Sequence, residues 1–303
     1  MNYYLSVDGG GTKTDFLLES EDRSVSVRLQ SGAASIKSVG EDAVRQNISA
    51  GLNALWQRAG IQLEQVRHAV FGMSGCDCAQ DEARLHKLLQ SLGWKPEQYT
   101  LCNDAVLGFY AAADPPGLVL IAGTGSIVLG VDARGAVTRS GGWGYGFSDQ
   151  GSGYWLGCRA LEQALLYCDG CGPYAPWFEE VARALNTPLD QLPQTATALE
   201  GCDEVASLAA LVLNWPEAEP LREEILTQGA AHLARLIRAG HQKLHLAPDA
   251  PFRLVFAGGC LRNTAYAARV ENNLPEPLRA ARVRGNGSAP VFGGMRLARK
   301  AGI

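Results

Sequence analysis

The sequence SVDGGGTKTDF, residues 6–16, places three consecutive glycines directly after a short apolar run. Glycine loses more conformational freedom on folding than any other residue, so three of them at the end of a strand need a reason. Residues 3–8 predict a buried strand, and Lys13 to Leu18 predict a second strand joined to it by the glycine turn. A hairpin turn of this kind exposes several backbone N–H groups, which suits the terminal phosphates of a nucleotide.

Two better-known nucleotide-binding motifs do not match this stretch. A P-loop has the pattern GxxxxGK[ST] before a helix, whereas here Lys13 follows Thr12 and the next residues resemble a strand. The dinucleotide fingerprint needs a third glycine at position 14, where threonine stands. Asp8, at the strand end, is the candidate ligand, through water, of Mg²⁺ carried by the phosphates. The residues expected to contact phosphate are Gly9, Gly10, Gly11, Thr12 and Lys13.

The composition is that of a globular protein long enough for two domains. The chain has 303 residues, of which 19% are charged and 47% hydrophobic. A formal net charge of −4 argues against a nucleic-acid-binding protein, which usually carries a basic face. No apolar run approaches the ~20 residues of a membrane span, and the N-terminus lacks a signal-peptide pattern. We therefore expect a cytoplasmic protein with neither a nucleic-acid nor a membrane partner.

Strand and helix patterns alternate along the first third of the chain. After the hairpin, residues 25–29, 67–75 and 99–104 predict strands. Helices are predicted over 43–59, 81–92 and 105–113. The sequence Asp-Pro-Pro-Gly at 114–117 then breaks the chain, so we predict domains of residues 1–115 and 116–303.

The same arrangement of strand, glycine turn and strand recurs after this break. Residues 117–126 form an apolar strand that ends in GTGS, and residues 127–132 predict the next strand. Residues 152–243 are mostly helical, a strand over 252–260 ends in glycines, and a last helix after Pro290 is a candidate to pack on the first domain. We therefore predict an α/β fold of two duplicated domains facing a central cleft. The further nucleotide contacts expected are Gly123, Thr124, Gly125, Ser126, Gly258 and Gly259.

An ordered set of motifs extends over nearly the whole chain. It reads DGGGTKT, SG at 74–75, ND at 103–104, GTGS, GGWG followed by SDQGS, and AGGC. As a set these motifs resemble the N-acetylglucosamine kinase and bacterial glucosamine kinase group of the BadF/BadG/BcrA/BcrD ATPases, in the sugar kinase, Hsp70 and actin superfamily. The resemblance implies two ribonuclease H-like (actin-like ATPase) domains, ATP and Mg²⁺ as cofactors, an amino sugar as substrate, and a homodimer.

The resemblance also assigns the general base. Kinases of this group use a carboxylate to accept the proton of the sugar hydroxyl, and the matching residue is Asp104, where a strand end opens a helix. Asparagine and aspartate are also common N-cap residues, so Asn103 and Asp104 have a structural interpretation as well. The two roles are compatible, and we interpret Asp104 as the base.

The stretch GGWGYGFSDQGSGYW, residues 141–155, is the expected sugar-binding segment. By resemblance Trp143, Gly144 and Asp149 lie in the sugar pocket. Core packing is the alternative for Trp143, because most tryptophans are largely buried. Ser152 precedes a helix and is interpreted as its N-cap. The other sugar contacts implied by the resemblance are Ser74, Gly75, Asn103 and Asp104.

One residue departs from the pattern of the family. Its members usually carry an asparagine in the loop after the third strand, where this chain has Ser35 within GAASI, residues 32–36. A serine offers one hydroxyl where asparagine offers an amide donor and an acceptor. The choice between glucosamine and N-acetylglucosamine therefore stays open, as does that between the 6- and the 1-hydroxyl.

Cysteine and histidine patterns give little support to a metal site. The eight cysteines are expected to be reduced thiols, because no secretory signal is found. The pairs Cys168/Cys171 and Cys76/Cys78 lack the second pair of a structural zinc site. His241 and His245 stand four apart in a predicted helix, without the carboxylate of HExxH.

Two other functions compete with a sugar kinase. One is an ATP-driven activator of a radical dehydratase that holds an iron–sulfur cluster. Such activators lack the segment GGWG…DQGS, and the cysteines of this chain are scattered. The other is a non-catalytic sugar sensor, which would need a DNA-binding extension before the first strand.

Overall fold

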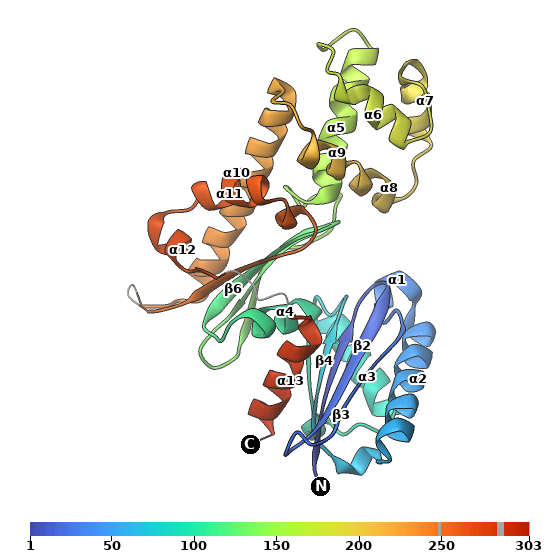
Figure 1. Ribbon diagram of the computed structural model, residues 1–303, viewed down its shortest axis with the longest axis vertical. Coiled ribbons are helices and arrows are strands. Elements are labelled where there is room, and N and C mark those ends of the chain that lie inside the picture. Colours follow the sequence, from blue (N-terminus) through green and yellow to red (C-terminus); the bar gives the residue numbers. More distant parts are fainter. Residues whose placement is uncertain (248–249, 284–287, 303) are drawn as a thin grey trace. The chain divides into compact units, whose positions relative to one another are not determined.

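The computed structural model of the protein describes residues 1–247, 250–283 and 288–302. The chain divides into two compact units, one formed by Met1–Asp114 with Arg284–Ile303 and the other by Pro115–Val283 (Figure 1). The division falls one residue before the boundary expected from the sequence. The last helix, α13 (Pro290–Ala301), belongs to the first unit, on which it was a candidate to pack, although the predicted domain bounds placed residues 116–303 in the second.

The first unit contains a five-stranded sheet in the order β3-β2-β1-β4-β5. Its first three strands, β1 (Tyr3–Gly9), β2 (Lys13–Ser20) and β3 (Ser26–Gly32), form an antiparallel meander through the glycine turn. The next two, β4 (Val66–Met73) and β5 (Tyr99–Cys102), run parallel to β1. The carboxyl ends of β1, β4 and β5 therefore lie at one edge of the sheet.

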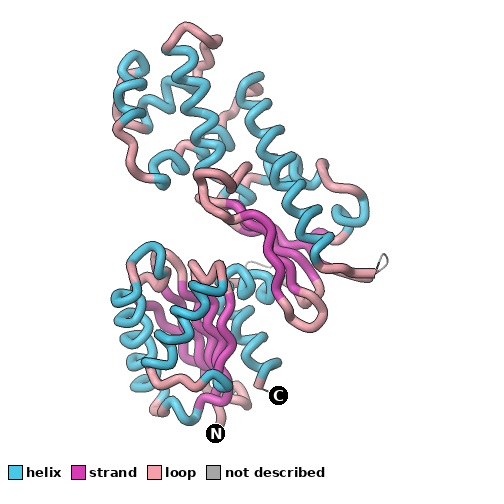
Figure 2. The backbone as a smooth tube through the Cα atoms, turned by 180° about the vertical axis from the view of Figure 1, so that it is seen from behind, coloured by secondary structure: helices cyan, strands magenta, loops and turns pink. Residues whose placement is uncertain are grey.

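Helices cover both faces of this sheet (Figure 2). Alternate residues of a strand point to opposite faces, and the strands carry buried apolar residues on both, so each face packs against helices. Tyr3, Leu5 and Val7 of β1 face one core, and Tyr4 faces a second core that also contains Leu107. The helices and 3-10 turns of this unit are α1 (Ile36–Val39), α2 (Glu41–Ala59), η1 (Leu63–Gln65), α3 (Ala79–Ser91), η2 (Pro96–Gln98), α4 (Asp104–Ala112) and α13.

Close packing explains why α13 joins the first unit. A Cβ atom on Gly293 would lie 1.9 Å from the Leu107 carbonyl oxygen, and one on Gly294 would lie 2.1 Å from Ser6 Oγ. These glycines therefore let α13 approach α4 and β1 more closely than any side chain would allow. Met295 and Ala298 on the same helix complete the core beside Tyr4.

The second unit repeats the topology of the first, in the order β10-β9-β6-β7-β8. Its meander is β6 (Gly117–Ala122), β7 (Ser126–Val131) and β8 (Val137–Gly141). The strands β9 (Arg253–Ala257) and β10 (Arg282–Val283) run parallel to β6. The duplicated α/β architecture predicted from the two glycine turns is thus confirmed, although β8 and β10 were not predicted.

Between its meander and β9 the second unit is helical, as predicted. The helices and 3-10 turns of this segment are α5 (Gly153–Cys168), α6 (Trp177–Ala184), η3 (Leu189–Gln191), α7 (Leu192–Thr197), α8 (Cys202–Ser207), α9 (Ala209–Asn214) and α10 (Pro220–Lys243). After β9 come η4 (Cys260–Arg262), α11 (Thr264–Asn272) and α12 (Glu276–Ala280). The predicted helix through His245 is wrong: α10 ends at Lys243, and His245 has a positive φ of 47°. The ring of His241 packs on that of Phe252, with the two ring centroids 4.7 Å apart. In the part of the chain that the structure describes, no helix is long and apolar enough to cross a membrane.

Candidate active site

In the first unit, the predicted catalytic and sugar-binding residues follow three neighbouring parallel strands. Asp8 stands next to last in β1, Ser74 follows β4, and Asn103 follows β5. The Ser74 N–H donates to the Gly9 carbonyl oxygen at 2.8 Å, which joins the ends of β1 and β4. The carboxyl edge of parallel strands is where α/β proteins usually bind ligands.

The three glycines of the first turn have different reasons for lacking a side chain. A Cβ atom on Gly9 would lie 2.8 Å from Met73 Sδ, so this glycine leaves room for the buried Met73 side chain. On Gly11 the nearest contact would be an ordinary 3.4 Å, to Ser38 Oγ. The Gly10 N–H donates to the Lys13 carbonyl oxygen at 3.0 Å and so closes the hairpin. Residues 11–13 are exposed, so this part of the turn is accessible to an anion.

Asn103 and Asp104 have separate local roles. Asn103 is the N-cap of α4, and its side-chain oxygen accepts from the Ala105 N–H at 3.0 Å. Asp104 is the first residue of the helix proper. Burial, assisted by the charge of Asp77, raises the pKa of Asp104 to about 6. A carboxyl with this pKa is mostly ionised at neutral pH and still able to accept a proton there.

Asp8 lies in an environment that favours a bound cation. Burial raises its pKa to about 7, with further increases from the charges of Asp104 and Asp15 that Lys13 and Arg28 offset in part. Carboxylate oxygen is the ligand type that Mg²⁺ prefers, and a divalent cation would relieve this repulsion. Asp8 therefore has the chemistry of an Mg²⁺ ligand. Over residues 1–247, 250–283 and 288–302, no three His, Cys, Asp or Glu side chains form a metal-binding group.

The predicted sugar contacts of the first unit lie close to one another. A Cβ atom on Gly75 would lie 3.6 Å from Ser35 Oγ and 3.5 Å from Lys37 Cγ. Gly75 has a φ of 86°, a backbone conformation that favours glycine. Ser35 itself is buried at the start of α1. The loops after β3 and β4 thus meet at the edge where Asp104 begins α4.

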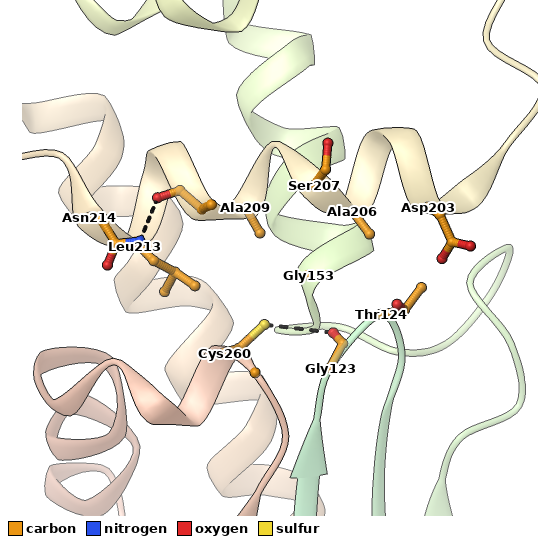
Figure 3. Close-up of a pocket in the computed structure, with 12 residues that line it drawn as sticks. Gly123, Thr124, Gly153, Asp203, Ala206, Ser207, Ala209, Leu213, Asn214 and Cys260 are labelled. Atoms are coloured by element: carbon orange, nitrogen blue, oxygen red, sulfur yellow. Dashed lines mark hydrogen bonds between the residues drawn. The ribbon is translucent and has the colours of Figure 1, made fainter. Parts of the chain in front are cut away.

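In the second unit, a pocket of about 540 Å³ brings together parts of two predicted glycine motifs (Figure 3). Gly123 and Thr124 come from the end of β6, and Gly259 comes from the turn after β9. Within the described chain, no atom lies within 4 Å of a Cβ position built on Gly123 or on Gly259. Nothing in the protein's own packing therefore forbids a side chain at these two positions, and both glycines leave space in the pocket.

The other glycines of these motifs serve the protein's own packing. A Cβ atom on Gly258 would lie 2.3 Å from the Ala122 carbonyl oxygen, and one on Gly125 would lie 2.8 Å from Asp149 Oδ2. Ser126 Oγ donates to the Gln150 carbonyl oxygen at 3.2 Å. These three residues therefore help to hold the backbone around the pocket in place, and they do not line the pocket.

Sequence reasoning missed the opposite wall of this pocket, which α8 and α9 provide (Figure 3). Cys260, in η4, donates its thiol proton to the Gly123 carbonyl oxygen at 3.6 Å. The run of small residues in VASLAA, residues 205–210, was the available signal, because small side chains leave room for a ligand. The lining residues that sequence reasoning did not predict are Gly153, Asp203, Ala206, Ser207, Ala209, Ala210, Leu213, Asn214 and Cys260.

The aromatic stretch 141–155 begins on the surface and ends in the interior. Trp143 is 69% exposed, so the alternative of core packing is wrong, and Arg139 stacks over its ring at 4.2 Å. Gly144 follows with a φ of 101°. Asp149 is buried with a φ of 64°, and Ser152 caps α5 by accepting from the Trp155 N–H, as predicted.

All eight cysteines lie in described parts of the chain, and each is a free thiol. Cys168 Sγ donates to the Leu189 carbonyl oxygen at 3.2 Å, at the end of α5. Cys171 is exposed. Burial raises the pKa of the Cys76 thiol to about 12, and it also raises that of Cys102, so both are protonated at neutral pH.

The raised pKa of Asp104 predicts a pH-dependent effect on stability. The folded protein binds this proton below about pH 6 and the unfolded chain only below about 4, so the penalty of the buried charge grows as the pH rises through that interval. We expect Asp104→Asn to stabilise the ligand-free protein on the order of 2 kcal/mol at pH 8, and hardly at all at pH 4. Thermal midpoints measured at the two pH values test this. A variant destabilised equally at both would contradict it.

Along most of its length the chain is similar to proteins named as sugar kinases. The chain is 27% identical over 270 residues to the N-acetylmuramic acid/N-acetylglucosamine kinase of Clostridium acetobutylicum, covering 88% of each protein. It is 28% identical over 250 residues to the glucosamine kinase GspK of Vibrio cholerae, covering 80% of this chain and 82% of that protein.

A solved structure from Chromobacterium violaceum, provisionally named as an N-acetylglucosamine kinase, superposes with a TM-score of 0.74 at 24% identity over 98% of this chain and 99% of that one. This likeness confirms the predicted fold of two α/β domains. Residues 5–293 match the sequence model of the BadF/BadG/BcrA/BcrD ATPase family. The chain belongs to the BadF/BadG/BcrA/BcrD ATPase family.

Proposed function

We propose that this protein is an ATP-dependent hexosamine kinase that phosphorylates glucosamine or N-acetylglucosamine at the 6-hydroxyl. The observation that carries the proposal is the buried carboxylate of Asp104 at the strand edge shared by Asp8 and Ser74. The kinases that the chain resembles act, by name, on such sugars. The fold alone would not select a sugar among substrates, so the substrate class rests on those relatives.

In the proposed reaction Asp104 accepts the proton of the sugar hydroxyl. The hydroxyl oxygen forms its bond to the γ-phosphorus as the bond from that phosphorus to the β,γ-bridging oxygen of ATP breaks. The proton remains on Asp104 and the negative charge leaves with ADP. With a pKa of about 6, Asp104 is ionised before the reaction at neutral pH.

The phosphates of ATP are assigned to the two glycine turns. In the first unit this is the turn Gly9–Lys13, where residues 11–13 are exposed and Lys13 adds a cation. In the second unit it is the turn Gly123–Ser126, and the pocket beside Gly259 would hold the nucleoside. Mg²⁺, when bound, neutralises phosphate charge, and Asp8 is the residue that would hold it.

The sugar is assigned to the polar residues around Asp104 and to the aromatic stretch. Ser35, Ser74, Gly75 and Asn103 come from the loops that meet at this edge. From the second unit we assign the exposed ring of Trp143, with Gly144 and Asp149. A homodimer and a cytoplasmic location are also part of this proposal and rest on the family resemblance and the composition.

The test is an ADP-release assay with ATP and Mg²⁺ over N-acetylglucosamine, glucosamine, N-acetylmannosamine and glucose. We expect turnover on at least one of the first two sugars and little on glucose. Coupling of the product phosphorus to the C6 protons in NMR would establish the phosphorylated hydroxyl.

Two outcomes would contradict the proposal. ATP hydrolysis without transfer to any sugar, with iron and sulfide in the purified protein, would favour the activator. Sugar binding without turnover would favour the sensor. If glucosamine reacts and its acetylated form does not, Ser35→Asn becomes the variant to test for a change of substrate.

A further inference from the structure

Asp77, in the loop between β4 and α3, connects two segments of the candidate site. Its Oδ2 accepts from Lys37 Nζ at 2.6 Å, and its Oδ1 accepts from Asn103 Nδ2 at 2.9 Å. Neither the sequence motifs nor the pocket described above includes Asp77. One of its carboxylate oxygens therefore binds a predicted sugar contact, Asn103, and the other binds Lys37, two residues after the predicted sugar contact Ser35.

Lys37 connects the loop of Ser35 to the loop of Gly75. It stands two residues after Ser35, and its Cγ lies 3.5 Å from the Cβ position of Gly75. Its ammonium group also lies 3.4 Å from Asp81 Oδ2. The Lys37 side chain is 54% exposed, so its ion pairs contribute little to global stability and act mainly on local geometry.

The Asn103 amide is held at both of its polar atoms. Its oxygen accepts from the Ala105 N–H, and its nitrogen donates to Asp77. A flipped amide would place its oxygen against the Asp77 carboxylate, so Asp77 fixes the orientation in which Asn103 caps α4. Asp104 is the next residue in the chain and the first of that helix.

We propose that Asp77 is a positioning residue for the phosphoryl transfer. Its carboxylate holds Lys37 and the Asn103 cap together, so that Asp104 begins α4 in one fixed place relative to the loop of Ser35. The inference rests on the proposed function, in which Asp104 is the base. Because transfer depends on alignment, a small displacement of the base costs much more rate than the lost contact costs stability.

The kinetic test compares three variants. Asp77→Ala removes both contacts, and we expect kcat to fall about tenfold, with KM for ATP within about twofold of wild type. Asp77→Asn keeps an oxygen that can accept from Asn103, and its loss should stay below about threefold. The comparison variant is Asp81→Ala, which removes the other carboxylate from Lys37 and a hydrogen bond to the Asp77 N–H but leaves the contact between Asp77 and Asn103 in place, so its loss of kcat should stay below about threefold. Equal losses in the two alanine variants would overturn the inference.

A second measurement does not depend on turnover. The side-chain amide of Asn103 can be followed by ¹⁵N NMR in the full chain and assigned by its disappearance in Asn103→Ser. We expect its resonances to shift in Asp77→Ala and to stay in place in Asp81→Ala. Unmoved resonances in Asp77→Ala would overturn the positioning role whatever the activity. Failure of the wild-type protein to phosphorylate any sugar would instead overturn the proposed function.

Discussion

Replacing Asp104 by asparagine is expected to lower kcat for sugar phosphorylation by about 10²- to 10⁴-fold, the range typical of losing a general base. The amide has the size of the carboxyl, and the Ala105 N–H still donates to the side-chain oxygen of Asn103, so the start of α4 should be preserved. What it lacks is a group able to take up a proton at neutral pH. KM values for ATP and sugar should change much less than kcat.

The stability prediction separates this loss from misfolding. If the charge of Asp104 serves catalysis at a cost in stability, Asp104→Asn should be more stable than the wild-type protein at pH 8. The same variant should have lost most of its kinase activity. Asp42→Asn, an exposed carboxylate in the first turn of α2, serves as the matched control and should change neither property. An Asp104→Asn variant that keeps more than about a tenth of wild-type kcat would contradict the assignment of the base.

The sequence predicted the two sheets because the physical signal was local. Apolar runs ending in glycine turns marked β1 with β2 and β6 with β7, and the repeat of that pattern indicated the duplicated topology. The strand β8 is short and bears Thr138, Arg139 and Ser140, so it gives no apolar run. The placement of α13 depends on Gly293 and Gly294, whose close contacts with α4 and β1 are non-local.

The candidate site was predictable where it depends on residues at strand ends, and unpredictable where it depends on packing. Asp8 was selected from its place at a strand end and Asp104 from the family resemblance, and both lie at the carboxyl edge of the parallel strands of one sheet. The sequence does not tell which glycines leave space for a ligand and which only avoid a clash inside the protein. Gly123 leaves open space in a pocket, whereas Gly125, two residues later, avoids a clash with Asp149. The wall formed by α8 and α9 carries no signal in the sequence beyond the small residues of 205–210, and the folded chain is needed to place it opposite Gly123.

The pocket of the second unit predicts the other large effect, that Gly259→Leu impairs nucleotide binding without impairing folding. Gly259 has helical angles of −60° and −42°, which any residue can adopt, and the described chain places no atom within 4 Å of its Cβ position. The leucine side chain would therefore enter the space assigned to the nucleoside. Overpacking of this kind costs about 1–3 kcal/mol, which corresponds to a rise of about 5- to 150-fold in the Kd for ADP.

Binding of a fluorescent ADP analogue measures this effect directly and does not depend on which sugar is the substrate. The matched control is Gly201→Leu, because Gly201 also has angles accessible to leucine, −100° and 131°, and its Cβ position meets only ordinary contacts at 3.9 Å. Gly201 lies outside the pocket lining, so its variant should bind ADP as wild type does. If Gly259→Leu keeps wild-type thermal stability and also binds ADP normally, the nucleoside does not occupy this pocket. If only Gly259→Leu loses affinity, the absence of a side chain at Gly259 is explained by the ligand, since the protein's own packing does not require it.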